Sequence, residues 1–74
     1  MAKRIVVLGA GISGVGAAVL AKQKGFDVFV SDKGTITDKN KVVLLNNEIE
    51  WEEQKHTLEY ILNADEVIKS PGSS

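Results

Sequence analysis

The chain has 74 residues, which is room for one small domain but not for two. Apolar residues make up 43% and charged residues 26%, a balance typical of a globular protein and not of a disordered chain. The formal net charge of −1 does not favour binding to nucleic acid or to an anionic membrane, and the absence of cysteine excludes disulfides and thiolate chemistry.

The N-terminal segment predicts a buried strand. Four apolar residues, 5–8, end at Gly9, as expected for a strand covered on both faces of a parallel sheet. The run is far shorter than the roughly 20 apolar residues that a membrane span needs. With no cysteine and no span, we expect a cytoplasmic protein without a membrane partner.

A helix and a second strand follow. Good helix formers fill residues 13–24, and Gly25 stands where a helix typically ends. Residues 26–31 restore the strand pattern and end at Asp32. The first 32 residues therefore predict a strand, helix and strand, with the two strands parallel and the crossover right-handed.

The second half predicts short elements. These are a helix over 38–46 with Thr37 as N-cap, a strand over 49–51, a helix over 57–62 and a strand over 66–69. Trp51 and Tyr60 are expected to pack at the margin of the core. We expect His56 to lie on the surface, and a solvated group of acids, without metal, at Glu48, Glu50, Glu52 and Glu53.

One motif carries chemistry, the G-x-G-x-x-G of residues 9–14 between the first strand and the first helix. Gly9 permits a tight turn, Gly11 lets the backbone approach a phosphate, and Gly14 lets helix and strand pack closely. The amides and dipole of a helix N-terminus bind a diphosphate without a basic side chain. A compact turn with no ligand is the alternative interpretation.

Asp32 lies eighteen residues after Gly14, at the end of the second strand, where an acid binds a ribose hydroxyl in dinucleotide-binding proteins. Its alternative role is to cap the loop that follows. Ser13 has two possible roles, as a helix cap and as a phosphate ligand. The sequence thus predicts an α/β fold with a Rossmann-like parallel sheet and flanking helices, truncated after the fourth strand because such sheets average five to six strands.

Three stretches, residues 5–14, 28–32 and 64–72, resemble the N-terminal domain of the Mur ligase family, and within it the members that add D-glutamate in peptidoglycan synthesis. The Ala-Asp-x-Val-Ile-x-Ser-Pro-Gly ending of the third stretch is the most particular to the family. The resemblance spans the whole chain. It implies that residues 1–74 are the N-terminal nucleotide-binding part of a larger cytoplasmic, ATP-dependent, amide-bond-forming ligase.

The resemblance also implies the substrate, which is the UDP moiety of UDP-MurNAc-L-alanine. The implied contacts are Gly11, Ile12, Ser13 and Gly14 at the phosphates, Asp32 and Lys33 near the uracil, and Ser70 and Gly72 at the end of the fourth strand. An arginine that is frequent in the family is Gly34 here. ATP and magnesium belong to the whole enzyme, whose central and C-terminal domains we expect to be missing, so this chain should bind substrate without catalysing the reaction.

Two other functions fit the same residues. The glycine motif and Asp32 equally suit the NAD- or FAD-binding domain of an oxidoreductase. A regulatory module whose nucleotide binding shifts a partner's conformation is the non-enzymatic alternative. The Ser70-Pro71-Gly72 turn favours the ligase.

Overall fold

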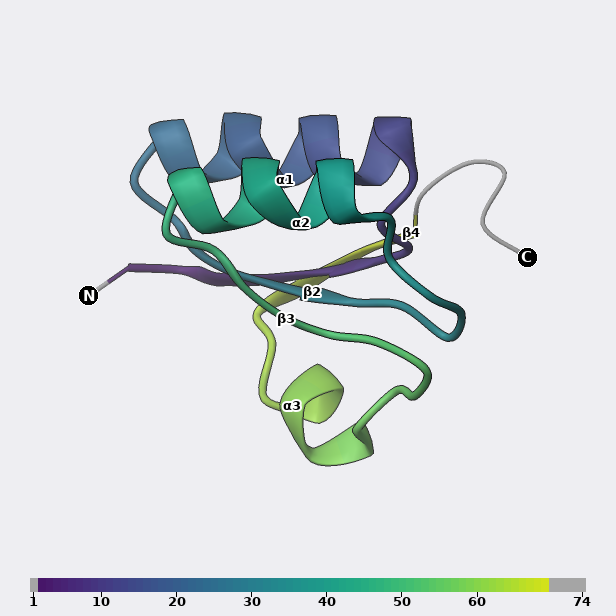
Figure 1. Ribbon diagram of the computed structural model, residues 1–74. Coiled ribbons are helices and arrows are strands. Elements are labelled where there is room, and N and C mark those ends of the chain that lie inside the picture. The colour runs from purple at the N-terminus through teal and green to yellow at the C-terminus, as the bar shows by residue number, and fades with distance from the viewer. Residues whose placement is uncertain (1, 70–74) are drawn as a thin grey trace.

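A computed structural model describes residues 2–69, which form a four-stranded sheet flanked by helices (Figure 1). In chain order the elements are β1 (Arg4–Leu8), α1 (Ile12–Gln23), β2 (Asp27–Ser31), α2 (Asp38–Asn46), β3 (Glu50–Glu52), α3 (Leu58–Leu62) and β4 (Glu66–Lys69). Every element expected from the sequence is present, and no end differs from its expected position by more than one residue.

The sheet has the order β3-β2-β1-β4, and every pair of neighbours is parallel. β1 lies between β2 and β4, and its Val6 and Val7 are completely buried. A central parallel strand is covered on both faces, which explains its unbroken apolar run. The predicted α/β fold with a Rossmann-like parallel sheet is confirmed.

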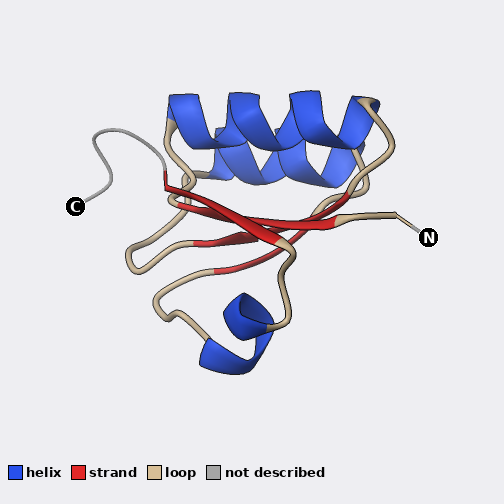
Figure 2. Cartoon of the chain, turned by 180° about the vertical axis from the view of Figure 1, so that it is seen from behind, coloured by secondary structure: helices blue, strands red, loops and turns tan. Residues whose placement is uncertain are grey.

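The two faces of the sheet are covered unequally. α1 and α2 lie side by side on one face, and the short α3 lies on the other (Figure 1, Figure 2). The main core fills the first interface, where Val30, Ala18 and Leu44 are fully buried. Trp51 packs against this core, whereas Tyr60 of α3 meets Phe29 edge to face on the opposite side, so both aromatic side chains lie at the margin as expected.

The helix ends agree with the sequence in part. Gly25, with a φ of +91°, ends α1, and the Thr37 hydroxyl accepts the Asn40 N–H at 3.3 Å as the N-cap of α2. Thr57 is the N-cap residue of α3, but its hydroxyl makes no capping hydrogen bond and donates to the Glu52 carboxylate. Across residues 2–69, none of the helices has the length and apolar content needed to cross a membrane.

Candidate functional site

The glycine turn joins β1 to α1 at the carboxyl end of the central strand. Gly9 has a φ of +105°, a conformation that glycine adopts without steric cost, and its N–H donates to the Ser31 carbonyl at 2.8 Å. Gly11 is the N-cap of α1, and its carbonyl accepts the first helical hydrogen bond, from the Val15 N–H at 2.9 Å. The chain therefore changes from strand to helix within three residues.

Three backbone amides stand at the start of α1. The N–H groups of Ile12, Ser13 and Gly14 precede the first helical hydrogen bond, and no hydrogen bond within residues 2–69 uses them. Such amides, with the positive end of the helix dipole, form an anion-binding position. The N-cap is Gly11 and no side chain caps the helix, which excludes the first of the two roles considered for Ser13, whereas its phosphate role stays a prediction.

Space is open beside Gly11. A Cβ built on this glycine would meet no other atom within 4 Å, and Ile12 and Ser13 are both exposed. Gly14, in contrast, is buried, as close packing of helix and strand requires. Packing within the described residues thus leaves the approach to Gly11 unblocked.

Asp32 reaches the glycine turn. Its Oδ2 accepts the Ala10 N–H at 2.6 Å, and its Oδ1 accepts the Gly34 N–H at 2.7 Å. The carboxylate therefore lies beside the turn, as the nucleotide interpretation expects, and it also caps the loop after β2, as the alternative interpretation expects. Each carboxylate oxygen has a second lone pair that a ligand hydroxyl or N–H can use.

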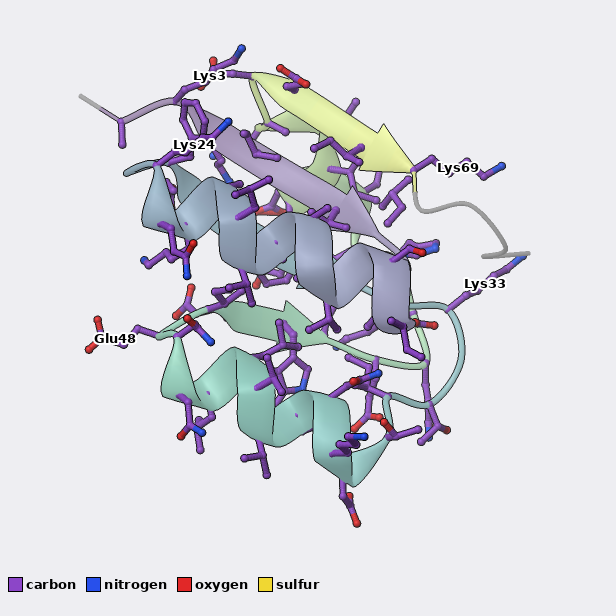
Figure 3. All side chains as sticks on the ribbon, turned by 90° about the horizontal axis from the view of Figure 1, so that it is seen from above. Lys3, Lys24, Lys33, Glu48 and Lys69 are labelled. Carbon is purple, nitrogen blue, oxygen red and sulfur yellow. The ribbon has the colours of Figure 1, made fainter. Side chains whose placement is uncertain are left out.

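Two lysines extend from the same end of the molecule. Lys33 follows Asp32, Lys69 ends β4, and Figure 3 shows both side chains pointing outward at the end of the sheet opposite Lys24. Lys69 was not among the predicted site residues. Its place could have been inferred, because the last residue of a strand parallel to β1 must lie at the edge that carries the glycine turn.

Asn40 is a second residue that sequence reasoning missed. Its side-chain Nδ2 donates to the Ala10 carbonyl at 2.9 Å, from the first turn of α2. Thirty residues separate the two partners. No local pattern predicts this contact.

A network of hydrogen bonds around the buried Ser31 side chain supports the end of β2. The fully buried Ser31 hydroxyl lies 2.8 Å from Glu52 Oε2 and 2.6 Å from His56 Nδ1, and the Thr57 N–H donates to Glu52 Oε2 at 2.7 Å. Burial acts to raise the pKa of Glu52, but hydrogen bonds from Thr57 and Ser31 outweigh it and hold this pKa below its usual value. The expectation that Glu52 is solvated is wrong. His56 is exposed, as predicted.

Glu53 holds the loop that carries Lys33. Its Oε1 accepts the Ile36 N–H at 3.0 Å, and its Oε2 pairs with Lys41 Nζ at 2.7 Å. The hydrogen bond from Lys41 is the main reason that the pKa of Glu53 lies below its usual value. Glu53 is thus also engaged in structure and not merely solvated, whereas Glu48 and Glu50 are exposed, as expected.

The structure brings five of the predicted site residues to one place, which are Gly11, Ile12, Ser13, Gly14 and Asp32. Lys33 stands next to them at the surface. The other two, Ser70 and Gly72, lie outside the described residues. A parallel sheet in this order, with a glycine turn opening α1 and an acid after β2, places the chain in the class of Rossmann-like α/β domains.

Residues 4–74 match the family described as MurD N-terminal domain, and the chain belongs to this family. It is 69% identical over 70 residues to a protein of Bacteroides fragilis named "UDP-N-acetylmuramoylalanine--D-glutamate ligase". Proteins of the same name from Christiangramia forsetii and Ligilactobacillus salivarius are 61% identical over 72 residues and 46% identical over 71. These alignments cover 95–97% of this chain but only 16% of each relative.

Proposed function

We propose that this chain binds the UDP moiety of UDP-MurNAc-L-alanine, as the N-terminal nucleotide-binding domain of a ligase that adds D-glutamate to that substrate. Residues 1–74 are, in this proposal, part of one such domain in a larger enzyme. The MurD N-terminal family membership and the names of the relatives support it. The observation that carries it is the open glycine turn, with the first amides of α1 on one side and Asp32 on the other.

Backbone groups are the proposed ligands of the diphosphate. The amides of Ile12, Ser13 and Gly14 donate to phosphate oxygens, and Gly11 allows their close approach because it has no side chain. The helix dipole adds a favourable field that needs no positive net charge. The exposed Lys69, at the same end of the sheet, contributes long-range attraction that salt would screen.

The nucleoside is proposed to lie beside Asp32 and Lys33. Two backbone N–H groups donate to the Asp32 carboxylate and hold it in place beside the glycine turn. The remaining lone pairs of the carboxylate are the proposed acceptors for the nucleoside. Ser70 and Gly72 are proposed to contact the ligand at the end of β4. Their roles rest on the family resemblance alone.

The reaction itself is a proposal for the whole protein, which we place in the cytoplasm. In the whole enzyme, ATP would transfer its terminal phosphate to the carboxylate of the UDP-linked substrate and leave as ADP, and the amine of D-glutamate would then displace phosphate from this acyl phosphate to form the amide. Magnesium would neutralise the phosphate charges. Within residues 2–69 no group of three His, Cys, Asp or Glu side chains is placed to hold a metal ion, so we derive no magnesium-dependent step for this part of the chain. The task proposed for the chain is binding and orientation.

Parallel titrations test this function. The ¹⁵N-labelled chain is titrated with UDP, UDP-MurNAc-L-alanine and NAD, and amide resonances are followed. We expect both UDP ligands to shift the amides of residues 11–14, while Gly25 at the other end of α1 serves as an internal control. A clear preference for NAD would support the oxidoreductase alternative, and no binding of any ligand would refute the proposal.

A further inference from the structure

Two side chains hold Ala10 from opposite sides. Its N–H donates to Asp32 Oδ2 at 2.6 Å, and its carbonyl accepts from Asn40 Nδ2 at 2.9 Å. Ala10 itself is buried, with 3% of its surface exposed. Both peptide groups that flank this residue are therefore fixed by partners far away in the sequence.

The Asn40 contact also sets the direction of the next amide. Because a trans peptide is planar, its C=O and N–H point in opposite directions. The Ala10 carbonyl points to Asn40, so the Gly11 N–H points away from it. One side-chain hydrogen bond thus orients the first N–H of the proposed phosphate-binding turn.

This peptide needs such support because of its glycine. Rotation of a peptide plane changes ψ of the residue before it and φ of the residue after it, and glycine accepts almost any φ. Apart from Gly11 itself and its two chain neighbours, no atom lies within 4 Å of the Cβ position of Gly11, so the space beside this peptide is open. A rotated Ala10–Gly11 peptide would present a carbonyl oxygen, which repels an anion, where the N–H stands now.

Asn40 is well placed to hold the turn. It is half-buried in the first turn of α2, and its own N–H donates to the Thr37 cap. The next residue, Lys41, pairs with Glu53 at 2.7 Å. These contacts fix the start of α2, so the Asn40 amide is presented from an anchored element.

We propose that Asn40 is a positioning residue for the nucleoside diphosphate. It keeps the Ala10–Gly11 peptide in the orientation that turns the Gly11 N–H toward a bound phosphate, and it does not touch the ligand itself. This inference rests on the proposed function, in which the glycine turn binds UDP.

Asn40→Asp tests it. The change nearly preserves shape but replaces the N–H donor, at neutral pH, by an acceptor that opposes the Ala10 carbonyl. A negative charge in the first turn of α2 favours the helix dipole, so the helix should persist. Asn46→Asp is the control, because it makes the same charge change at an exposed position at the other end of α2.

Two quantities are measured on the ¹⁵N-labelled chain, the Gly11 amide resonance without ligand and the dissociation constant for UDP. We expect Asn40→Asp to move the Gly11 resonance and to weaken UDP binding about tenfold, the effect of one lost hydrogen bond of ordinary strength. The control should leave the Gly11 resonance in place and change binding less than about twofold.

Asn40→Ala gives a second measurement without a charge change, and it decides the question if Asn40→Asp does not fold. We expect it to weaken UDP binding about threefold to tenfold. If a folded variant melts earlier but keeps the parent's Gly11 resonance and UDP affinity, Asn40 is only structural and the inference is overturned while the proposed function stands. If the parent chain binds no UDP, the proposed function fails and this inference fails with it.

Discussion

Two consecutive residues at the end of β2 have separate tasks. The Ser31 hydroxyl contacts Glu52 and His56, whereas the Asp32 carboxylate contacts the backbone of Ala10 and Gly34. Successive side chains of an extended chain point to opposite sides, so one position supports the sheet and the next reaches the glycine turn. Because both Asp32 oxygens accept hydrogen bonds from backbone amides, replacing this residue should disturb the conformation of the turn even when no ligand is bound.

Gly11→Val separates the binding role of this glycine from a structural one. Gly11 has a φ of −75° and open space at its Cβ position, so we expect the variant to fold with nearly the parent's melting temperature. UDP binding should be lost, because the new side chain occupies the approach to the amides. Circular dichroism and a UDP titration measure the two effects.

Gly16→Val is the matched control, since Gly16 is also exposed, has equal space at its Cβ position and lies more than one turn into α1. It should fold and bind as the parent chain does, apart from a small gain in helix stability, because valine has a higher helix propensity than glycine. An unfolded Gly11→Val would show that the glycine is needed for the fold. Unchanged UDP binding by the Gly11→Val variant would show that the turn is not part of the binding site.

Helices α1, α2 and α3 differ in how many side chains they bury against the sheet. α1 packs four buried residues against the sheet, whereas α3 has five residues, none of them buried, and leaves Leu58 and Leu62 exposed. α2 is intermediate, since it buries only Leu44 and depends on its N-terminal contacts for support. Short helices gain little from propensity alone, so the Thr37 cap should matter for the placement of α2.

Thr37→Ala should lower the free energy of unfolding by about 1 kcal/mol, because the Asn40 N–H loses its acceptor. Urea denaturation followed by circular dichroism measures it. Thr37→Ser, which keeps the hydroxyl, should stay within a few tenths of a kcal/mol of the parent. Equal stability of the alanine and serine variants would show that the cap contributes nothing.

At the scale of the whole molecule, two hydrogen-bonded carboxylates connect stability to pH. Glu52 and Glu53 both have a pKa below the usual value in the folded chain. A lowered folded pKa contributes stability that is present above the unfolded pKa and is lost as pH falls through the folded one. The free energy of unfolding should therefore decrease on acidification below about pH 4.

Glu52→Gln tests the source of this acid sensitivity. It should lower the free energy of unfolding at neutral pH, because glutamine has only one acceptor oxygen, whereas both oxygens of Glu52 accept hydrogen bonds from Thr57 and Ser31. The variant should also lose less stability than the parent below about pH 4. Urea denaturation at several pH values measures both effects. Exposed Glu50→Gln is the control, and an equal pH dependence in the two variants would contradict the role of Glu52.

Sequence reasoning succeeded where the signal is local. The glycine motif, the strand before it and the acid after the next strand lie within 32 residues, and each has a backbone reason for its residue type. It failed where partners are distant. Glu52 is one of four acids in a short segment, and only pairing of β2 with β3 places it against Ser31 and buries it.

The sequence by itself determined the class of fold and the position of the turn. Apolar runs, segments of helix formers and glycines follow one another along the chain, and each restricts the backbone over a short distance. The sequence also carried the family resemblance, which the match over residues 4–74 confirms. Only the tertiary structure decided which side chains hold the turn. Asn40 and Asp32 meet Ala10 across 30 and 22 residues of chain, and such contacts form only when packing of α2 and β2 around β1 brings their elements together.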